Sequence, residues 1–504
     1  MQNLKQTVFI RTMTHNRVIV LAILFITLSL LLAYLIYQAV SLNYLPFYSD
    51  EYSYYLDAKS FQLYNRIDAA TTLNESYSLL GHAGFHGFSY SVFYGSFFKL
   101  LTFFGIEPSI MLVNIFLVAG ASILLIWIKT PLEEKLLIGI VFMSNFMLIL
   151  FISSEMTEIF HYVFAFVVGY LLYLVYDTRE RRYLYCLIVL IVVLSFFRQS
   201  WIFVLLGLFP LAKSWRDVVK FAFIFLLGLF FVLLDIKLFH APFPFGFFQK
   251  LSVYLQTHPI ADTLDLLYNY FLKNIDNYFF LVSYEKTKFI FYYKFLFIFI
   301  LLYGVYSSYK TKEKSIISGT LIAVAIFFAL LALYDTYDWR EVRMLSTPFM
   351  ILAVILILNQ KFFPIYIIIL FQLSTLYPVL DYQKWVNDRR ENMNTLIQEQ
   401  QPQIDAFSDL GNYVAAYKKK EVLVLLKPTL FSIEYSPQFY SLPLSLNGKY
   451  IRYSWIFGKK FNISDSRCDL YVGDSPEKLN NMKLVGSNKY FYFYKRIPDD
   501  PKNR

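Results

Sequence analysis

Two adjacent carboxylates, Asp50 and Glu51, are the first residues whose types and spacing could do chemistry. They follow a long apolar segment and open a run that is rich in tyrosine. If that run is helical, an acid in its first turn is stabilised by the helix dipole and could act as a general base beside a membrane cavity. The alternative interpretation is a solvated loop without a chemical role.

A second acidic motif, 153–158, lies between two apolar segments. An ionisable side chain that borders hydrocarbon is costly and is a functional-site hypothesis by default, which makes Glu158 and Glu155 candidates. The alternative is helix capping, with Thr157 or Ser154 at the N-cap and a glutamate in the first turn.

Three arginines, Arg198, Arg340 and Arg343, stand beside apolar segments on the face where the acidic motifs are expected. The planar guanidinium group is suited to bind phosphate in a partly dry site, so these residues are candidate ligands of a donor phosphate. The alternatives are snorkelling of the long side chains to the interface and ion pairing with the acids nearby, Asp335, Asp338 and Glu341.

His82 and His86 are four residues apart and could share one face of a helix, where they could ligate a metal ion. The glycines around them, Gly81, Gly84 and Gly87, argue against a stable helix there. The two histidines are therefore additional candidates only. These residues do not identify a metal, and a divalent cation is the only cofactor that the sequence suggests.

Long apolar segments must position these candidates. The chain has 504 residues, of which 57% are hydrophobic and 16% charged, and its mean hydropathy is +0.48. Soluble domains are about a quarter charged. A spanning helix needs about 20 mostly apolar residues. Eleven segments are predicted to be such helices: 18–40, 109–128, 136–152, 159–176, 183–197, 201–211, 218–239, 289–306, 316–333, 345–358 and 362–380.

The net charge of +10 does not indicate a nucleic-acid partner, because the basic residues stand in short clusters between apolar segments. Such clusters mark the cytoplasmic loops of membrane proteins. The N-terminal tail, with Lys5, Arg11 and Arg17, is predicted to be cytoplasmic. The basic clusters that follow residue 104 are cytoplasmic only if segment 85–104 does not cross the membrane. This segment is therefore predicted to be a helix on the outer interface.

This topology places three large regions outside, at 43–108, 240–288 and 381–504. The last of them is polar and reads as a helix followed by short strands. It is predicted to be a small extracytoplasmic α/β domain. The strands are expected at 422–426, 450–455, 469–472 and 490–495.

These features together resemble the GT-C superfamily of multi-span glycosyltransferases, which use polyprenyl-phosphate sugars and include protein O-mannosyltransferases and lipid A aminoarabinose transferases. The family pattern is an acidic pair in the first outer loop, interfacial helices after it and an acid in the next outer loop. Asp50 and Glu51, segment 85–104, and Glu158 with Glu155 match that pattern. The stretches GFSYSVFYGSFFKLLTFFGIEPSIMLVN and SSEMTEIFHYVFAF are similar to the family's interfacial helix and to the start of its fourth span.

The resemblance implies that residues 1–380 are the catalytic domain of an inverting glycosyltransferase in the inner or plasma membrane. Asp50 would be the general base for a hydroxyl of a glycan, lipid or protein acceptor, and the three arginines would bind the lipid phosphate that leaves. Glu51 and Glu158 would orient the acceptor or hold a divalent cation. The sequence departs from the family pattern in two ways. Glu158 stands where many members carry aspartate, and no subfamily motif that would name the sugar is found.

Three other classes remain open from the sequence. A lipid-linked glycan transporter or flippase would show internal repeats and charges at the midplane, and neither is evident. An O-antigen ligase or polymerase would use a long outer loop, for which 240–288 could serve, but the early acidic pair would be unexplained. A structural or assembly protein with a sensor tail is the third alternative.

Overall fold

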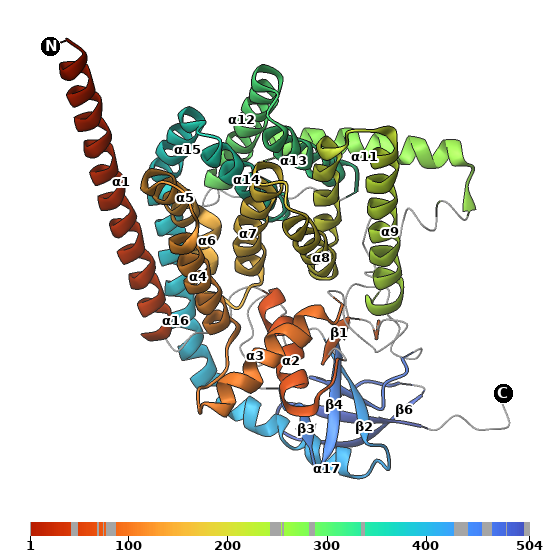
Figure 1. Ribbon diagram of the computed structural model, residues 1–504. Helices are drawn as coiled ribbons and strands as arrows, with labels where there is room; N and C mark the ends of the chain where they lie inside the picture. The colour runs from red at the N-terminus through yellow and green to blue at the C-terminus, as the bar shows by residue number, and fades with distance from the viewer. Residues whose placement is uncertain are drawn as a thin grey trace.

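In the computed structural model, the described part of the protein has three layers (Figure 1). A bundle of helices forms the first layer, helices α2 and α3 lie against one end of it, and a β-sheet lies beyond them. The described residues are 2–41, 49–67, 70–73, 75–76, 87–241, 254, 257–281, 288–333, 338–427, 442–455, 466–479 and 481–497.

Six helices in the described residues are long and apolar enough to cross a membrane. The architecture is consistent with a membrane protein that has several spans. The six are α1 (Gln2–Ser41), α4 (Ile110–Trp127), α7 (Glu158–Asp177), α9 (Trp215–Phe239), α12 (Lys288–Thr311) and α13 (Lys314–Leu333).

Judged by helix length and apolar composition, the predicted number of eleven spans is therefore too high. A seventh is counted if α15 (Phe362–Ser374) and the start of α16 (Leu376–Phe407), which meet at a bend of 41°, form one span. The other predicted segments are short or broken. They form α5 (Leu132–Ser144), α6 (Phe146–Phe151), α8 (Arg181–Phe197), the 3₁₀-helix η1 (Gln199–Leu211) and α14 (Asp338–Leu358).

The break between α5 and α6 has a local cause. Asn145 has an extended backbone, with φ −69° and ψ 130°, and its side-chain oxygen accepts the backbone N–H of Met147 at 2.9 Å. Asparagine favours such caps because its side chain can replace a backbone acceptor. Its amide also donates to the Tyr293 hydroxyl at 3.2 Å, which ties the break to α12.

The layer beside the bundle consists of α2 (Ser49–Tyr64) and α3 (Ser89–Phe103), which pack against each other. Helix α3 corresponds to the predicted interfacial segment, and with 15 residues it is not among the helices that could cross a membrane. Gly95 permits the close contact, because a Cβ there would lie 2.7 Å from the backbone oxygen of Ala58 on α2. The position of α3 on a membrane interface stays a prediction.

The sheet has the strand order β1-β4-β2-β5-β7-β6, with β3 paired to β4. Strands β1, β4, β2 and β5 are mutually parallel, and β6 and β7 are antiparallel additions. All four predicted strands are present. The bounds are β1 (Thr71–Leu73), β2 (Glu421–Leu426), β3 (Ser445–Leu446), β4 (Lys449–Trp455), β5 (Leu470–Gly473), β6 (Met482–Ser487) and β7 (Tyr492–Arg496).

Strand β1 comes from the first predicted outer region, so the sheet is not built from C-terminal residues alone. The Glu75 carboxylate, just after β1, accepts the backbone N–H groups of Arg467 and Cys468 at 2.7 and 2.9 Å. The Ser60 hydroxyl on α2 lies 2.6 Å from the Tyr450 hydroxyl on β4. These contacts join the α2–α3 layer to the sheet. The helices α11 (Ile260–Phe280) and α17 (Leu410–Ala415) complete the described structure.

Candidate active site

Glu158 lies between two of the predicted phosphate-binding arginines. Its Oε1 atom accepts from Arg198 Nη2 at 3.1 Å and from Arg343 Nε at 2.5 Å. The Glu158 side chain is 0% exposed, while those of Arg198 and Arg343 are 15% and 20% exposed. Arg198 also donates to the backbone oxygen of Arg343 at 3.0 Å. We refer to these three residues as the Glu158 centre.

Helix ends bring the Glu158 centre together. Glu158 is the first residue of α7, Arg198 directly follows α8, and Arg343 lies in the first part of α14. Two of the arginines thus form ion pairs with Glu158. The side chains of the acids named as alternative partners, Asp335, Asp338 and Glu341, lie outside the described residues. The Oε2 atom of Glu158 is buried and has no hydrogen-bond partner among the described residues.

The acidic pair and the second acidic motif also meet. Glu51 is buried on α2, and its Oε1 atom accepts the backbone N–H of Glu155 at 2.7 Å. Glu155 is buried as well, and its Oε2 atom accepts the backbone N–H of Ile110 at 2.6 Å. Glu155 therefore contacts the start of α4 and not the first turn of α7. The capping alternative had Thr157 or Ser154 at the N-cap of α7; Thr157 is at that position but makes no side-chain capping hydrogen bond, and Glu158 is the acid in the first turn.

The remaining candidates can be placed only in part. Asp50 is the second residue of α2, as the helical interpretation of this run predicted, and Arg340 is in α14. The side chains of both lie outside the described residues. His82 and His86 lie outside them altogether.

A buried arginine that the sequence did not single out contacts the second acidic motif. Arg390, on α16, donates from Nη2 to the backbone oxygen of Ser153 at 3.2 Å, and Gln383 donates to the Ser153 hydroxyl at 2.7 Å. Arg390 is among the largest fully buried side chains described. Its only sequence signal was an arginine in a polar helix, which is normally a solvated residue.

A buried hydrogen-bonded chain lies next to the Glu158 centre. Trp201 Nε1 donates to His161 Nδ1 at 2.9 Å, and His161 Nε2 lies 2.6 Å from the Tyr90 hydroxyl. The His161 side chain is buried. The Tyr90 ring packs against Tyr54, Phe160 and Phe197. Burial raises the pKa of Tyr90 to about 12, so its phenol stays protonated.

Helix α2 carries a further perturbed acid. Asp57 Oδ1 accepts the backbone N–H of Ala70 at 2.8 Å, just before β1. Burial raises the pKa of Asp57 to about 8, although hydrogen bonds from the Ala70 and Thr71 backbone oppose that shift. Burial also raises the pKa of Tyr52, with a smaller contribution from the charge of Glu51.

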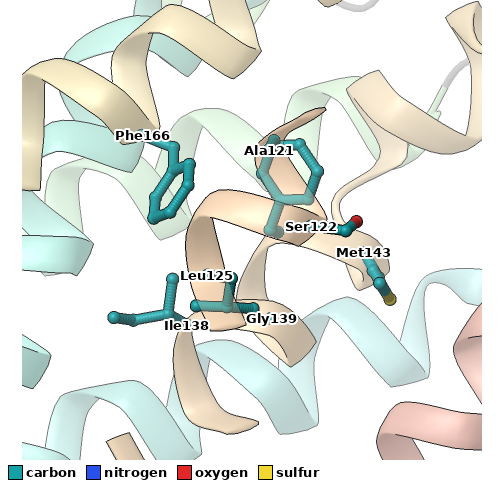
Figure 2. Close-up of a pocket in the computed structure, with 8 residues that line it drawn as sticks. Ala121, Ser122, Leu125, Ile138, Gly139, Met143 and Phe166 are labelled. Atoms are coloured by element: carbon teal, nitrogen blue, oxygen red, sulfur yellow. The ribbon is translucent and has the colours of Figure 1, made fainter. Parts of the chain in front are cut away.

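Among the described residues, no group of three or more His, Cys, Asp and Glu side chains could hold a metal ion. A small pocket lies among α4, α5 and α7 (Figure 2), lined by apolar residues such as Leu125, Phe142 and Phe166. No charged residue lines that pocket, so it is not part of the Glu158 centre.

Comparison with known proteins adds no identity to this geometry. No protein-family model and no curated protein matches the sequence.

Proposed function

We propose that this protein is a membrane glycosyltransferase that moves a sugar from a polyprenyl-phosphate donor to an acceptor hydroxyl. The observation that carries the proposal is the Glu158 centre, in which two arginines share one buried carboxylate. The Glu158 centre therefore holds two guanidinium groups side by side. Because both arginines are partly exposed, they can still approach an anion, and a leaving phosphate is the anion that suits their geometry.

The reaction is written as a single displacement. Asp50, at the start of α2, takes the proton of the acceptor hydroxyl, and the hydroxyl oxygen forms a bond to the anomeric carbon. The bond from that carbon to the phosphate oxygen breaks, and the electron pair leaves with the lipid phosphate. Inversion at the anomeric carbon follows. Arg198 and Arg343 stabilise the charge of the leaving phosphate, and Arg340 is proposed to assist them.

The buried acids have different roles in this proposal. The Oε1 atom of Glu158 accepts hydrogen bonds from Arg198 and Arg343, and its Oε2 atom can accept a hydrogen bond from a substrate hydroxyl. A carboxylate paired with two guanidinium groups is a poor cation ligand, so the divalent-cation role does not fit Glu158. Glu51 holds the turn that contains Glu155 through a backbone hydrogen bond, which supports a positioning role.

In this proposal, the membrane topology determines the side of the membrane on which transfer takes place. The sheet and the Glu158 centre lie on the outer face, the N-terminus is cytoplasmic, and the acceptor is part of a cell-envelope glycan, lipid or protein. The basic clusters of the sequence support this orientation.

The decisive experiment measures transfer of radiolabelled sugar from a panel of polyprenyl-phosphate sugars by membranes that contain the protein. Wild-type membranes should transfer label, and Asp50→Asn should reduce the rate by about a hundredfold or more, since general-base catalysis contributes 10²–10⁴. Asp262→Asn on α11 is the matched control, because it removes an acid from another helix. An active Asp50→Asn protein contradicts the role of Asp50. Uptake of intact lipid-linked sugar without transfer would favour the flippase alternative.

A further inference from the structure

The Trp201–His161–Tyr90 chain lies about one turn along α7 from the Arg198–Glu158 ion pair. His161 comes three residues after Glu158 on α7, and Trp201 comes three residues after Arg198. Glu158 and His161 lie on the same face of α7, because residues three apart on a helix do so. Arg198 directly precedes η1. Helix α7 and the start of η1 are thus joined twice, once by an ion pair of 3.1 Å and once by a hydrogen bond of 2.9 Å.

The chemistry of tryptophan fixes the direction of this chain. The indole N–H can only donate, so His161 Nδ1 must be an unprotonated acceptor. A neutral imidazole then carries its proton on Nε2 and donates it to the Tyr90 oxygen at 2.6 Å. Tyr90 belongs to α3, so the chain also connects α3 to α7 and η1.

We propose that Tyr90, His161 and Trp201 are positioning residues that hold Glu158 and Arg198 at their catalytic spacing. The proposal rests on the proposed function as far as transfer is concerned, but the hydrogen-bond direction can be tested without it. Displacements of about 1 Å can cost about a hundredfold in rate. A neutral connection one turn along α7 from the ion pair prevents such displacement without adding a charge that would compete for the phosphate.

The first test is a comparison of two buried tyrosines. Tyr90→Phe removes a buried hydroxyl from the chain, while Tyr278→Phe removes a buried hydroxyl on α11 that donates to the backbone oxygen of Lys294 at 3.0 Å. Tyr90→Phe should lower kcat about tenfold or more with little change in KM, and Tyr278→Phe should leave kcat within about twofold. Equal effects of the two variants on kcat would overturn the proposal.

Substitution of the histidine gives a rescue experiment. Glutamine keeps one acceptor and one N–H donor, whereas leucine keeps neither. His161→Gln should therefore retain most of the transfer rate, and His161→Leu should lose about as much as Tyr90→Phe. Thermal unfolding of both variants in detergent identifies proteins that have failed to fold. A folded His161→Leu protein with the wild-type rate would refute the positioning role.

The last test does not depend on transfer. Nitrogen-15 NMR of histidine-labelled protein, with the His161 signal assigned by its loss in His161→Gln, reports which ring nitrogen carries the proton. The Nε2–H tautomer is expected in the wild type, and Trp201→Phe should allow the other tautomer. An Nδ1–H tautomer in the wild type would overturn the inference even if the protein is a transferase. If the protein shows the expected tautomer but transfers no sugar, the proposed function alone is rejected.

Discussion

At the residue scale, the Glu158 centre depends on one carboxylate that pairs with two cations. Glu158→Gln removes that charge and leaves Arg198 and Arg343 facing each other with little exposure. We expect a loss of about 2–4 kcal/mol in the free energy of unfolding, which is below the range for fully buried pairs because both arginines are partly exposed. Thermal unfolding in detergent measures it.

The control for this prediction is an exposed ion pair in the same chain. Arg182 and Glu180 are 68% and 44% exposed at 2.5 Å, and exposed pairs contribute little. Glu180→Gln should therefore leave the unfolding midpoint unchanged within error. If Glu158→Gln is as harmless as Glu180→Gln, the Glu158 centre does not hold α7, α8 and α14 together.

Asp57 makes stability depend on pH. Its pKa is about 8 in the folded protein and about 3.9 in an unfolded chain. Between these values the folded state binds a proton that the unfolded state does not, so the free energy of unfolding decreases as pH rises. The contribution of Asp57 is complete below about pH 4 and is lost as pH rises through about 8.

Asp57→Asn should remove that part of the pH dependence, because the amide oxygen can still accept the Ala70 N–H. Unfolding midpoints at pH 5 and pH 9 measure it. The wild type should lose more stability than the variant over this interval, with each pKa unit worth about 1.4 kcal/mol. The same pH slope in both proteins would show that Asp57 is not protonated in the fold.

At the element scale, the sequence predicts helix positions well and helix continuity poorly. Hydropathy places each of the six long apolar helices found in the described residues, because burial in lipid requires one long apolar segment per span. It does not reveal the break at Asn145 or the 3₁₀ geometry of η1. A single capping residue can interrupt a helix without changing hydropathy. The 3₁₀-helix η1 packs against the next helix, α9, and against α13, which lies far away in the sequence.

The same limit applies to the candidate site. Sequence motifs predicted Glu158, Arg198 and Arg343 as site residues, since charges next to apolar segments are costly. Their mutual pairing could not be predicted, because it depends on which helix ends are neighbours. The three-residue strand β1 and the buried Arg390 had no distinguishing signal. Their roles come from contacts with residues that are hundreds of positions away.

At the scale of the whole molecule, charged groups gather at two levels of the helical bundle. The Glu158 centre lies at the start of α7, which is 20 residues and therefore about 30 Å long. At the opposite end of α14, Lys361 pairs with Glu313 at 3.2 Å, next to the hydrogen bond between Ser315 and Asn359. The basic clusters of the sequence adjoin this second level. They are expected to be cytoplasmic.

Cysteine labelling tests this orientation. In a Cys186→Ser background the remaining Cys468 is buried, and burial raises its pKa to about 12, so it should not react. A new cysteine at the exposed Lys483 of β6 should react with a membrane-impermeant maleimide in intact cells, because the sheet is expected to be outside. A new cysteine at the exposed Lys310, at the end of α12, should react only after permeabilisation.

The outcome of that labelling decides which substrates can reach the Glu158 centre. Helices α2 and α3 lie between the bundle and the sheet (Figure 1), and Glu51 on α2 is hydrogen-bonded to the turn that precedes Glu158. The sheet and the centre are therefore on one side of the bundle. If Lys310→Cys reacts in intact cells and Lys483→Cys does not, the centre faces the cytoplasm. An envelope acceptor would then be excluded, whatever the chemistry of the site.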